Sequence, residues 1–202
     1  MAWLEPNVKE PLARIPERLG ISSNSLTIFG LFSIGISMAI LYVTKDLAWT
    51  FTLFMLGSIT DFIDGPLSRI TRKACPFGAW LDTQCDRYVE MIIGFAFTFY
   101  FFPDQYQMMV TFAAFSFAFL VTYTKSSAEE KKIKVEWKEK WLFGYPGRFL
   151  IICAGMLLTH WYPDSFRISM WGLLVFNVGV FIYRIRKVWA LKAQYSVPYE
   201  NQ

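Results

Sequence analysis

The sequence predicts an all-α, polytopic membrane protein with six transmembrane helices, preceded by a short amphipathic helix at the membrane surface. Three observations support this fold class. Hydrophobic residues make up 54% of the 202 residues and charged residues only 18%, below the roughly 25% that is usual in globular domains. Several apolar runs reach the ~20 residues that a helix needs to cross a bilayer. Basic residues gather in alternate connections between these runs, as expected of a chain that crosses a membrane repeatedly.

The segment 6–20 is the predicted surface helix. Leu12, Ile15 and Leu19 recur at helical spacing with basic residues between them, a pattern typical of a helix that lies in the membrane interface. The interleaved basic residues are Lys9, Arg14 and Arg18. The first residues are polar and lack the apolar region of a secretion signal, so we expect the first spanning helix to direct insertion.

We expect one domain at residues 22–192, with a juxtamembrane segment, 1–21, before it and a tail, 193–202, after it. The six expected spans lie at about 24–44, 47–70, 78–102, 105–126, 143–160 and 164–190. Ser22 to Ser25 offer capping side chains for the first of them. The second span ends in acidic residues and the third begins with them, although both are otherwise apolar.

The charge distribution predicts the orientation in the membrane. Of the 20 lysine and arginine residues, only Lys45 and Arg167 fall on one side of the predicted bilayer. The segment 125–140, on the other side, carries six lysines. Positively charged connections stay in the cytoplasm. We therefore expect a multi-pass integral membrane protein with both termini, and the acidic ends of the second and third spans, on the cytoplasmic side.

Four aspartates mark the junction of the second and third spans. Asp61 and Asp64 are three residues apart and Asp82 and Asp86 are four apart, so each pair shares one face of its helix. The two helices are joined by a short basic turn, so the four carboxylates are expected to converge. Acidic side chains at membrane depth are unfavourable, at ~2.5–3.5 kcal/mol for one at the centre of a span, which predicts bound cations. Carboxylate oxygens suit Mg²⁺ or Mn²⁺, and we expect two ions.

Two metal ions held by carboxylates favour in-line displacement at a phosphorus atom. Gly65 and Gly78 lack side chains and would let a nucleotide approach the helix backbone. Arg69 and the basic turn after it could pair with a pyrophosphate. Taken singly, a glycine is a packing notch and an arginine a topology signal. Their combination with four acids in the 26-residue window 61–86 favours a site of phosphoryl transfer.

The window reads D-x2-D-G-x2-S-R-x8-G-x3-D-x3-D, which resembles the signature of the CDP-alcohol phosphotransferase family, D-x2-D-G-x2-A-R-x8-G-x3-D-x3-D. The one departure is Ser68 in place of alanine. The resemblance implies transfer of a phosphatidyl-type group from a CDP-linked lipid to a small alcohol, with release of CMP. It also implies a homodimer among membrane lipids and two Mg²⁺ (or Mn²⁺) ions. The implied roles are metal ligation by Asp61, Asp64, Asp82 and Asp86, general-base catalysis by Asp86, and nucleotide binding by Asp64, Gly65, Ser68, Arg69, Gly78 and Asp82.

The acceptor alcohol is indicated by residues outside the window. Lys125, Arg148 and Arg184 lie near the cytoplasmic ends of the last three spans, and three cations suit a phosphorylated acceptor. The Y-x-K-x-x-x-E segment around Lys125 and the later arginines resemble the prokaryotic branch of the family that uses inositol phosphate. Ser127 and Gly147 depart from that branch, in which a basic and an acidic residue are expected. Glycerol phosphate, serine and other alcohols stay open as acceptors. The three cations could also serve only as topology signals.

Two functions of other classes compete with an enzyme. A divalent-cation transporter or channel would explain carboxylates inside spans, but not Gly65, Arg69 and Gly78 at fixed offsets. A structural membrane protein could use the basic segment 125–140 to bind anionic lipid headgroups, and would tolerate loss of the aspartates. The three cysteines and single histidine form no zinc or disulfide pattern, and no nucleic-acid partner is expected.

Overall fold

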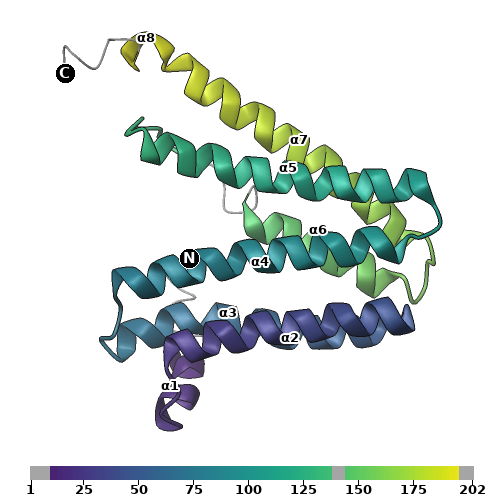
Figure 1. Cartoon of the computed structure of the whole chain (residues 1–202), viewed down its shortest axis with the longest axis horizontal. Coiled ribbons are helices and arrows are strands. Elements are labelled where there is room, and N and C mark those ends of the chain that lie inside the picture. Colours follow the sequence, from purple (N-terminus) through teal and green to yellow (C-terminus); the bar gives the residue numbers. More distant parts are fainter. Residues whose placement is uncertain (1–9, 138–143, 196–202) are drawn as a thin grey trace. The chain divides into compact units, whose positions relative to one another are not determined.

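The structure is a computed structural model that describes residues 10–137 and 144–195. Every regular element in these residues is a helix and none is a strand, which confirms the predicted all-α fold (Figure 1). The chain divides into two compact units, residues 1–100 and 101–202. Residues 6–9 of the predicted surface helix, residues 138–143 and residues 196–202 lie outside the described part of the chain.

The first unit is built around α2. Its helices are α1 (Glu10–Arg18), α2 (Ser23–Thr44), α3 (Leu47–Ile70) and α4 (Pro76–Tyr100). Ser22 is the N-cap of α2, and its Oγ accepts a hydrogen bond from the backbone N–H of Ser25. Lys45 ends α2 with a left-handed φ of 56°, and Asp46 then caps α3 through its carboxylate. The chain thus reverses within two residues, and α2 packs against both α3 and α4.

Two glycines allow α2 and α3 to approach closely. A Cβ atom on Gly57 would lie 2.6 Å from Cγ1 of Ile34, and one on Gly30 would lie 2.6 Å from Oγ1 of Thr60. Each such Cβ would also lie 3.3 Å from the backbone carbonyl of the other glycine. Small residues at such a crossing let helix backbones pack together without a gap. This crossing places the C-terminal half of α3 beside the start of α2.

The second unit contains α5 (Gln105–Glu130), α6 (Tyr145–Leu158), α7 (Ser165–Ala190) and the short α8 (Lys192–Tyr195). Side chains buried along α7 recur every three or four residues from Phe166 to Arg184, the spacing of a seam between two long helices. Gln107, near the start of α5, donates from Nε2 to the carbonyl of Arg167, near the start of α7. Asn177 donates from Nδ2 to the carbonyl of Ala114 farther along both helices, so α5 and α7 run parallel (Figure 1).

The helix boundaries agree with the predicted ranges to within two residues in most cases, although α5 continues to Glu130 instead of ending near 126. By length and hydropathy, α2, α5 and α7 qualify as membrane-spanning among the described helices. Helices α3 and α4 are long enough, with 24 and 25 residues, but each carries the predicted acids at one end. Helix α6 is apolar and has 14 described residues. Three of the described helices are therefore candidate membrane spans, and the total of six stays a prediction.

Candidate active site

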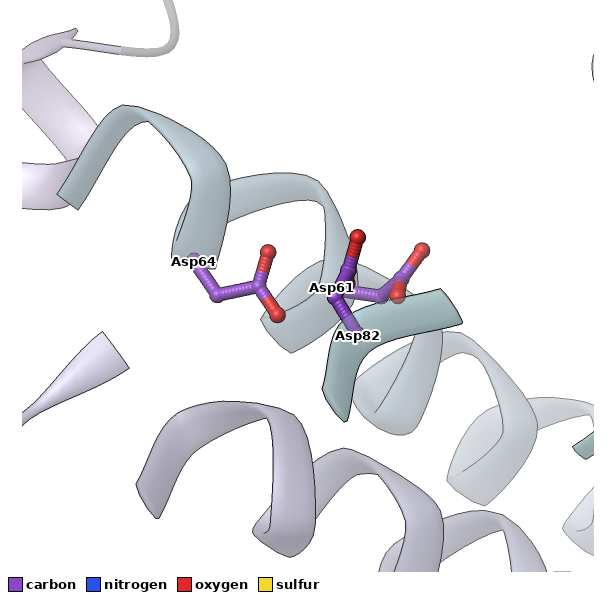
Figure 2. Close-up of side chains that lie close together, drawn as sticks. All are labelled: Asp61, Asp64 and Asp82. Carbon is purple, nitrogen blue, oxygen red and sulfur yellow. The ribbon is translucent and has the colours of Figure 1, made fainter. Parts of the chain in front are cut away.

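Three of the four predicted aspartates meet at one point. One carboxylate oxygen from each of Asp61, Asp64 and Asp82 lies within 4.8 Å of the other two. Figure 2 shows the carboxylate of Asp64 reaching from α3 toward those of Asp61 and Asp82. Asp64 is only 5% exposed, whereas Asp61 is open to solvent and Asp82 is half-buried. Carboxylate oxygens at this separation are suitable ligands for one or two divalent cations, so the residues present fit the expected metal.

Asp86 lies on the same face of α4, one turn after Asp82, but outside this group of three. Its charge interacts with those of Asp61 and Asp82, so it belongs to the same electrostatic cluster. Its Oδ2 lies 3.8 Å from a guanidinium nitrogen of Arg87, which also pairs with Glu90 one turn later. The position of Asp86 at the edge of the cluster suits a group that handles a proton beside the metal ligands.

The start of α2 supplies contacts to Asp64 that the sequence analysis missed. Thr27 donates from Oγ1 to Oδ2 of Asp64 over 2.6 Å, and both side chains are buried. Ser23 donates from Oγ to the backbone carbonyl of Asp64 over 2.8 Å. Two hydrogen bonds from one helix therefore fix both the carboxylate and the backbone of this residue. The only sign of these contacts in the sequence is a group of polar residues at the start of an apolar run. The same pattern also indicates a helix cap.

The predicted nucleotide-binding residues gather around the same helix ends. A Cβ atom on Gly65 would lie 4.0 Å from NH1 of Arg69, so the guanidinium faces the bare backbone at this glycine. A Cβ on Gly78 would lie 3.2 Å from Oδ1 of Asn24 on α2. Any side chain at either glycine would occupy space that a ligand near the backbone would need. Asn24 is thus a further polar group, not identified from the sequence, beside the predicted nucleotide site.

Ser68 has a defined local role. Its Oγ donates to the carbonyl of Gly65 over 2.8 Å, within α3. A serine that donates to its own helix leaves no unpaired hydroxyl hydrogen beside the site. The departure from the alanine of the signature is therefore accommodated inside the helix.

The three predicted acceptor-binding cations lie in the second unit. Arg148 on α6 donates from NH1 to the carbonyl of Ala118, and Arg184 on α7 donates from NH1 to the carbonyl of Val121. Both carbonyls belong to α5, three residues apart, and Lys125 lies one turn farther along the same helix. Lys125 forms an exposed ion pair with Glu129 at 3.8 Å. The structure therefore brings the three cations to one stretch of α5.

Two relatives that are named as synthases of inositol-phosphate lipids match this chain in sequence. The chain is 31% identical to the archaetidylinositol phosphate synthase of Pyrococcus horikoshii over 132 residues, which cover 64% of this chain and 68% of that one. It is 25% identical to the phosphatidylinositol phosphate synthase of Corynebacterium glutamicum over 185 residues, which cover 88% and 82%. These matches extend well beyond the aspartate window into the second unit.

Solved structures of the Mycobacterium tuberculosis phosphatidylinositol phosphate synthase have the same fold. The structure with CDP-DAG bound matches with a TM-score of 0.79 at 22% identity, over 90% of this chain and 94% of that one. The structure in complex with manganese and citrate matches with a TM-score of 0.78 at 22% identity, over 90% and 89%. Both units therefore have the fold of that Mycobacterium protein.

The family model for CDP-alcohol phosphatidyltransferases matches residues 21–183. The match begins just before α2 and ends near the C-terminal end of α7, so it spans both units. It includes the aspartate cluster together with Lys125 and Arg148, and ends one residue before Arg184. The chain belongs to the CDP-alcohol phosphatidyltransferase family and is a transferase of phospholipid synthesis.

Proposed function

We propose that this protein transfers a phosphatidyl-type group from a CDP-linked lipid to inositol phosphate and releases CMP. The observation that carries the proposal is the meeting of Asp61, Asp64 and Asp82 within 4.8 Å at adjoining ends of α3 and α4. The names of the Pyrococcus and Corynebacterium relatives support inositol phosphate as the acceptor, because the product in each name is a lipid that carries inositol phosphate. The CDP-DAG and manganese in structures of the Mycobacterium protein support the donor and a divalent metal.

In the proposed mechanism, two Mg²⁺ (or Mn²⁺) ions would be held by Asp61, Asp64, Asp82 and Asp86. When bound, these ions would stabilise negative charge on the phosphate oxygens of the donor. Thr27 keeps the Asp64 carboxylate in one orientation through its 2.6 Å hydrogen bond, which lowers the reorganisation needed when the donor arrives. Gly65, Ser68, Arg69 and Gly78 form the nucleotide side of the site, where Arg69 pairs with the pyrophosphate.

Asp86 is proposed as the general base. It takes the proton of the acceptor hydroxyl while that oxygen attacks the lipid-linked phosphorus, and the bond from this phosphorus to CMP breaks. Its side chain is 43% exposed, which leaves the carboxylate accessible to a proton. Asp86→Asn should therefore reduce turnover more than it reduces nucleotide binding.

Lys125, Arg148 and Arg184 are proposed to bind the phosphate of the acceptor. Support comes from their common location along α5 and from the preference of guanidinium and ammonium groups for phosphate. Lys125→Ala should raise the KM for inositol phosphate and leave the KM for the CDP-lipid unchanged. An unchanged acceptor KM would remove Lys125 from the acceptor site.

The protein is proposed to be a homodimer with six spans per chain. Both termini and the active site lie on the cytoplasmic side, and α1 is a helix on the membrane surface. Support for the surface helix is that α1 buries Ala13 against the protein while Ile15 on the same helix is 59% exposed, and Leu19, directly after it, is 70% exposed. The domain boundaries 22–192 are supported by the family match at residues 21–183. Cross-linking and cysteine accessibility in intact cells test the dimer and the orientation.

The first experiment measures Mg²⁺-dependent CMP release by purified protein with a CDP-lipid. The acceptor panel is inositol phosphate, inositol, glycerol phosphate and serine. We expect release with inositol phosphate, and its loss in Asp86→Asn. Release with another acceptor alone would keep the reaction and correct the substrate. No release from folded, metal-loaded protein, together with metal flux into vesicles, would support a transporter instead.

A further inference from the structure

The segment that follows α5 lies against the end of α7, where Arg184 is buried. Arg184 is 8% exposed, and its NH1 donates to the carbonyl of Val121 over 2.6 Å. The carbon at the centre of its guanidinium lies 5.4 Å from the centroid of the Trp137 ring. This distance is within the ~6 Å range of an attractive cation–π contact. The guanidinium of Arg184 is therefore bound to α5 by a hydrogen bond and covered by the ring of Trp137.

Two further hydrogen bonds attach this segment to the C-terminal part of the chain. Lys187 donates from Nζ to the carbonyl of Glu136 over 2.6 Å. The backbone N–H of Lys134 donates to Oη of Tyr195, on α8, over 3.0 Å. Both contacts involve residues within three positions of Trp137. The ring is therefore carried by backbone that is itself bonded to α7 and α8.

An aromatic ring is a suitable partner for an arginine that must also bind an anion. A guanidinium has five N–H donors, all in its plane, and a ring that covers its face uses none of them. Arginine also has several rotatable bonds, and holding it in one orientation in advance reduces the entropy lost when a ligand binds. A carboxylate partner would instead compete with a phosphate for the same donors.

We propose that Trp137 is a positioning residue that orients the Arg184 guanidinium for the phosphate of the acceptor. The inference rests on the proposed acceptor role of Arg184. Trp137 itself does not contact the reacting atoms; it acts through Arg184. Its removal should therefore weaken acceptor binding, without a change in the chemical step or in the binding of the CDP-lipid.

The test is steady-state CMP release by the full-length protein in detergent, with inositol phosphate and the CDP-lipid varied separately. Trp137→Ala should raise the acceptor KM about fivefold, with kcat and the donor KM changed less than twofold. Trp137→Phe, which keeps a ring, should restore most of the acceptor affinity. Tyr195→Phe, which removes only the hydroxyl that accepts from Lys134, should raise the acceptor KM by a smaller factor.

Trp189→Ala is the matched control. Trp189 is on the last turns of α7, and its ring lies 5.4 Å from Nζ of Lys192, so its removal deletes the same type of contact at a lysine outside the proposed site. Its acceptor KM should equal that of the wild type. A rise as large as that of Trp137→Ala would mean that any tryptophan at this end of α7 affects the site, and would overturn the inference.

The double variant Trp137→Ala/Arg184→Ala separates positioning from general stability. If Trp137 acts through Arg184, the double variant has the acceptor KM of Arg184→Ala alone. A further rise, or a normal KM in Trp137→Ala while Arg184→Ala is impaired, overturns the inference and leaves the proposed function intact. A normal acceptor KM in Arg184→Ala contradicts the acceptor role of Arg184 itself, and with it the inference. Absence of CMP release in the wild type contradicts the proposed function.

Discussion

The two units of the chain hold their functional polar groups in different ways. In the first unit, the carboxylate of Asp64 accepts a hydrogen bond from a hydroxyl on α2 and lies beside two further carboxylates. In the second, Arg148 and Arg184 each donate to a backbone carbonyl of α5. The acids come together because each pair is spaced to lie on one face of its helix, on two consecutive helices. The cations come from three helices and lie along the same stretch of α5. The first arrangement depends on side-chain identity, and the second on how the helices pack.

The largest effects should follow from removing acids in the first unit. Asp61→Ala and Asp82→Ala should each lower kcat/KM by at least about 10³-fold, because the remaining oxygens no longer complete a metal site. CMP release and metal binding by calorimetry measure the two effects. The control is Asp164→Asn in the second unit, where the Asp164 side chain is 81% exposed, and its kcat/KM should be close to that of the wild type. Equal activity in all three variants would contradict the metal site.

The next effect concerns the crossing that positions these acids. Gly57→Ala should lower both Tm and activity, because the new Cβ would lie 2.6 Å from Ile34 and 3.3 Å from the carbonyl of Gly30; such overpacking typically costs about 1–3 kcal/mol. Gly35→Ala on α2 is the matched control, since a Cβ there has no neighbour within 4 Å. Thermal unfolding and CMP release are measured together. If Gly57→Ala behaved like Gly35→Ala, the crossing would not position the site.

A third test compares buried threonines in the two units. Thr27→Val keeps the shape of the side chain but removes the donor to Asp64, and should lower kcat/KM about tenfold, because hydrogen bonds to charged groups contribute about 1.5–3 kcal/mol. Thr27→Ser should retain activity. Thr111→Val in the second unit should have little effect, because its hydroxyl donates to Gln107 of its own helix. Similar losses in the two valine variants would show that Thr27 acts through packing alone.

The smallest effect is expected at an ion pair of the second unit, between α5 and α7. The backbone N–H of Gln107 and the guanidinium of Arg167 lower the pKa of the Asp104 carboxyl below its usual value. A lowered pKa stabilises the folded state above the unfolded value of ~3.9, and this contribution is lost as the pH falls through the folded value. Asn caps helices as well as Asp. Asp104→Asn should therefore lower Tm slightly at pH 7 and not in strong acid, and a pH-independent difference would contradict the ionic contribution.

The sequence predicted the helices well because their signals are local. The length of each apolar run and the cap at Ser22 do not depend on partners. The aspartate pairs were identified for the same reason, since spacings of three and four residues place side chains on one face. Thr27 was missed because a threonine in an apolar run becomes a ligand-orienting group only when another helix brings a carboxylate to it.

The second unit was harder to predict. The end of the last span carries several basic residues, and nothing local distinguishes the one that is buried. Arg184 is 8% exposed, whereas Arg186 is exposed to solvent two residues later. The difference arises from the packing of α7 on α5, which turns one residue toward the carbonyl of Val121. The spacing of buried residues along both helices is visible in the sequence only after the partner helix is known.

The crossing at Gly30 and Gly57 lies close to the aspartate cluster. Asp64 lies seven residues beyond Gly57, or ~10 Å along the helix at 1.5 Å per residue. A change of ~10° in the angle between α2 and α3 would therefore move the carboxylate by ~2 Å relative to Thr27. Membrane helices change tilt when the surrounding bilayer is thinner or thicker than their apolar length. The thickness of the lipid bilayer would then tune the rate at which this protein makes new lipid for that same bilayer.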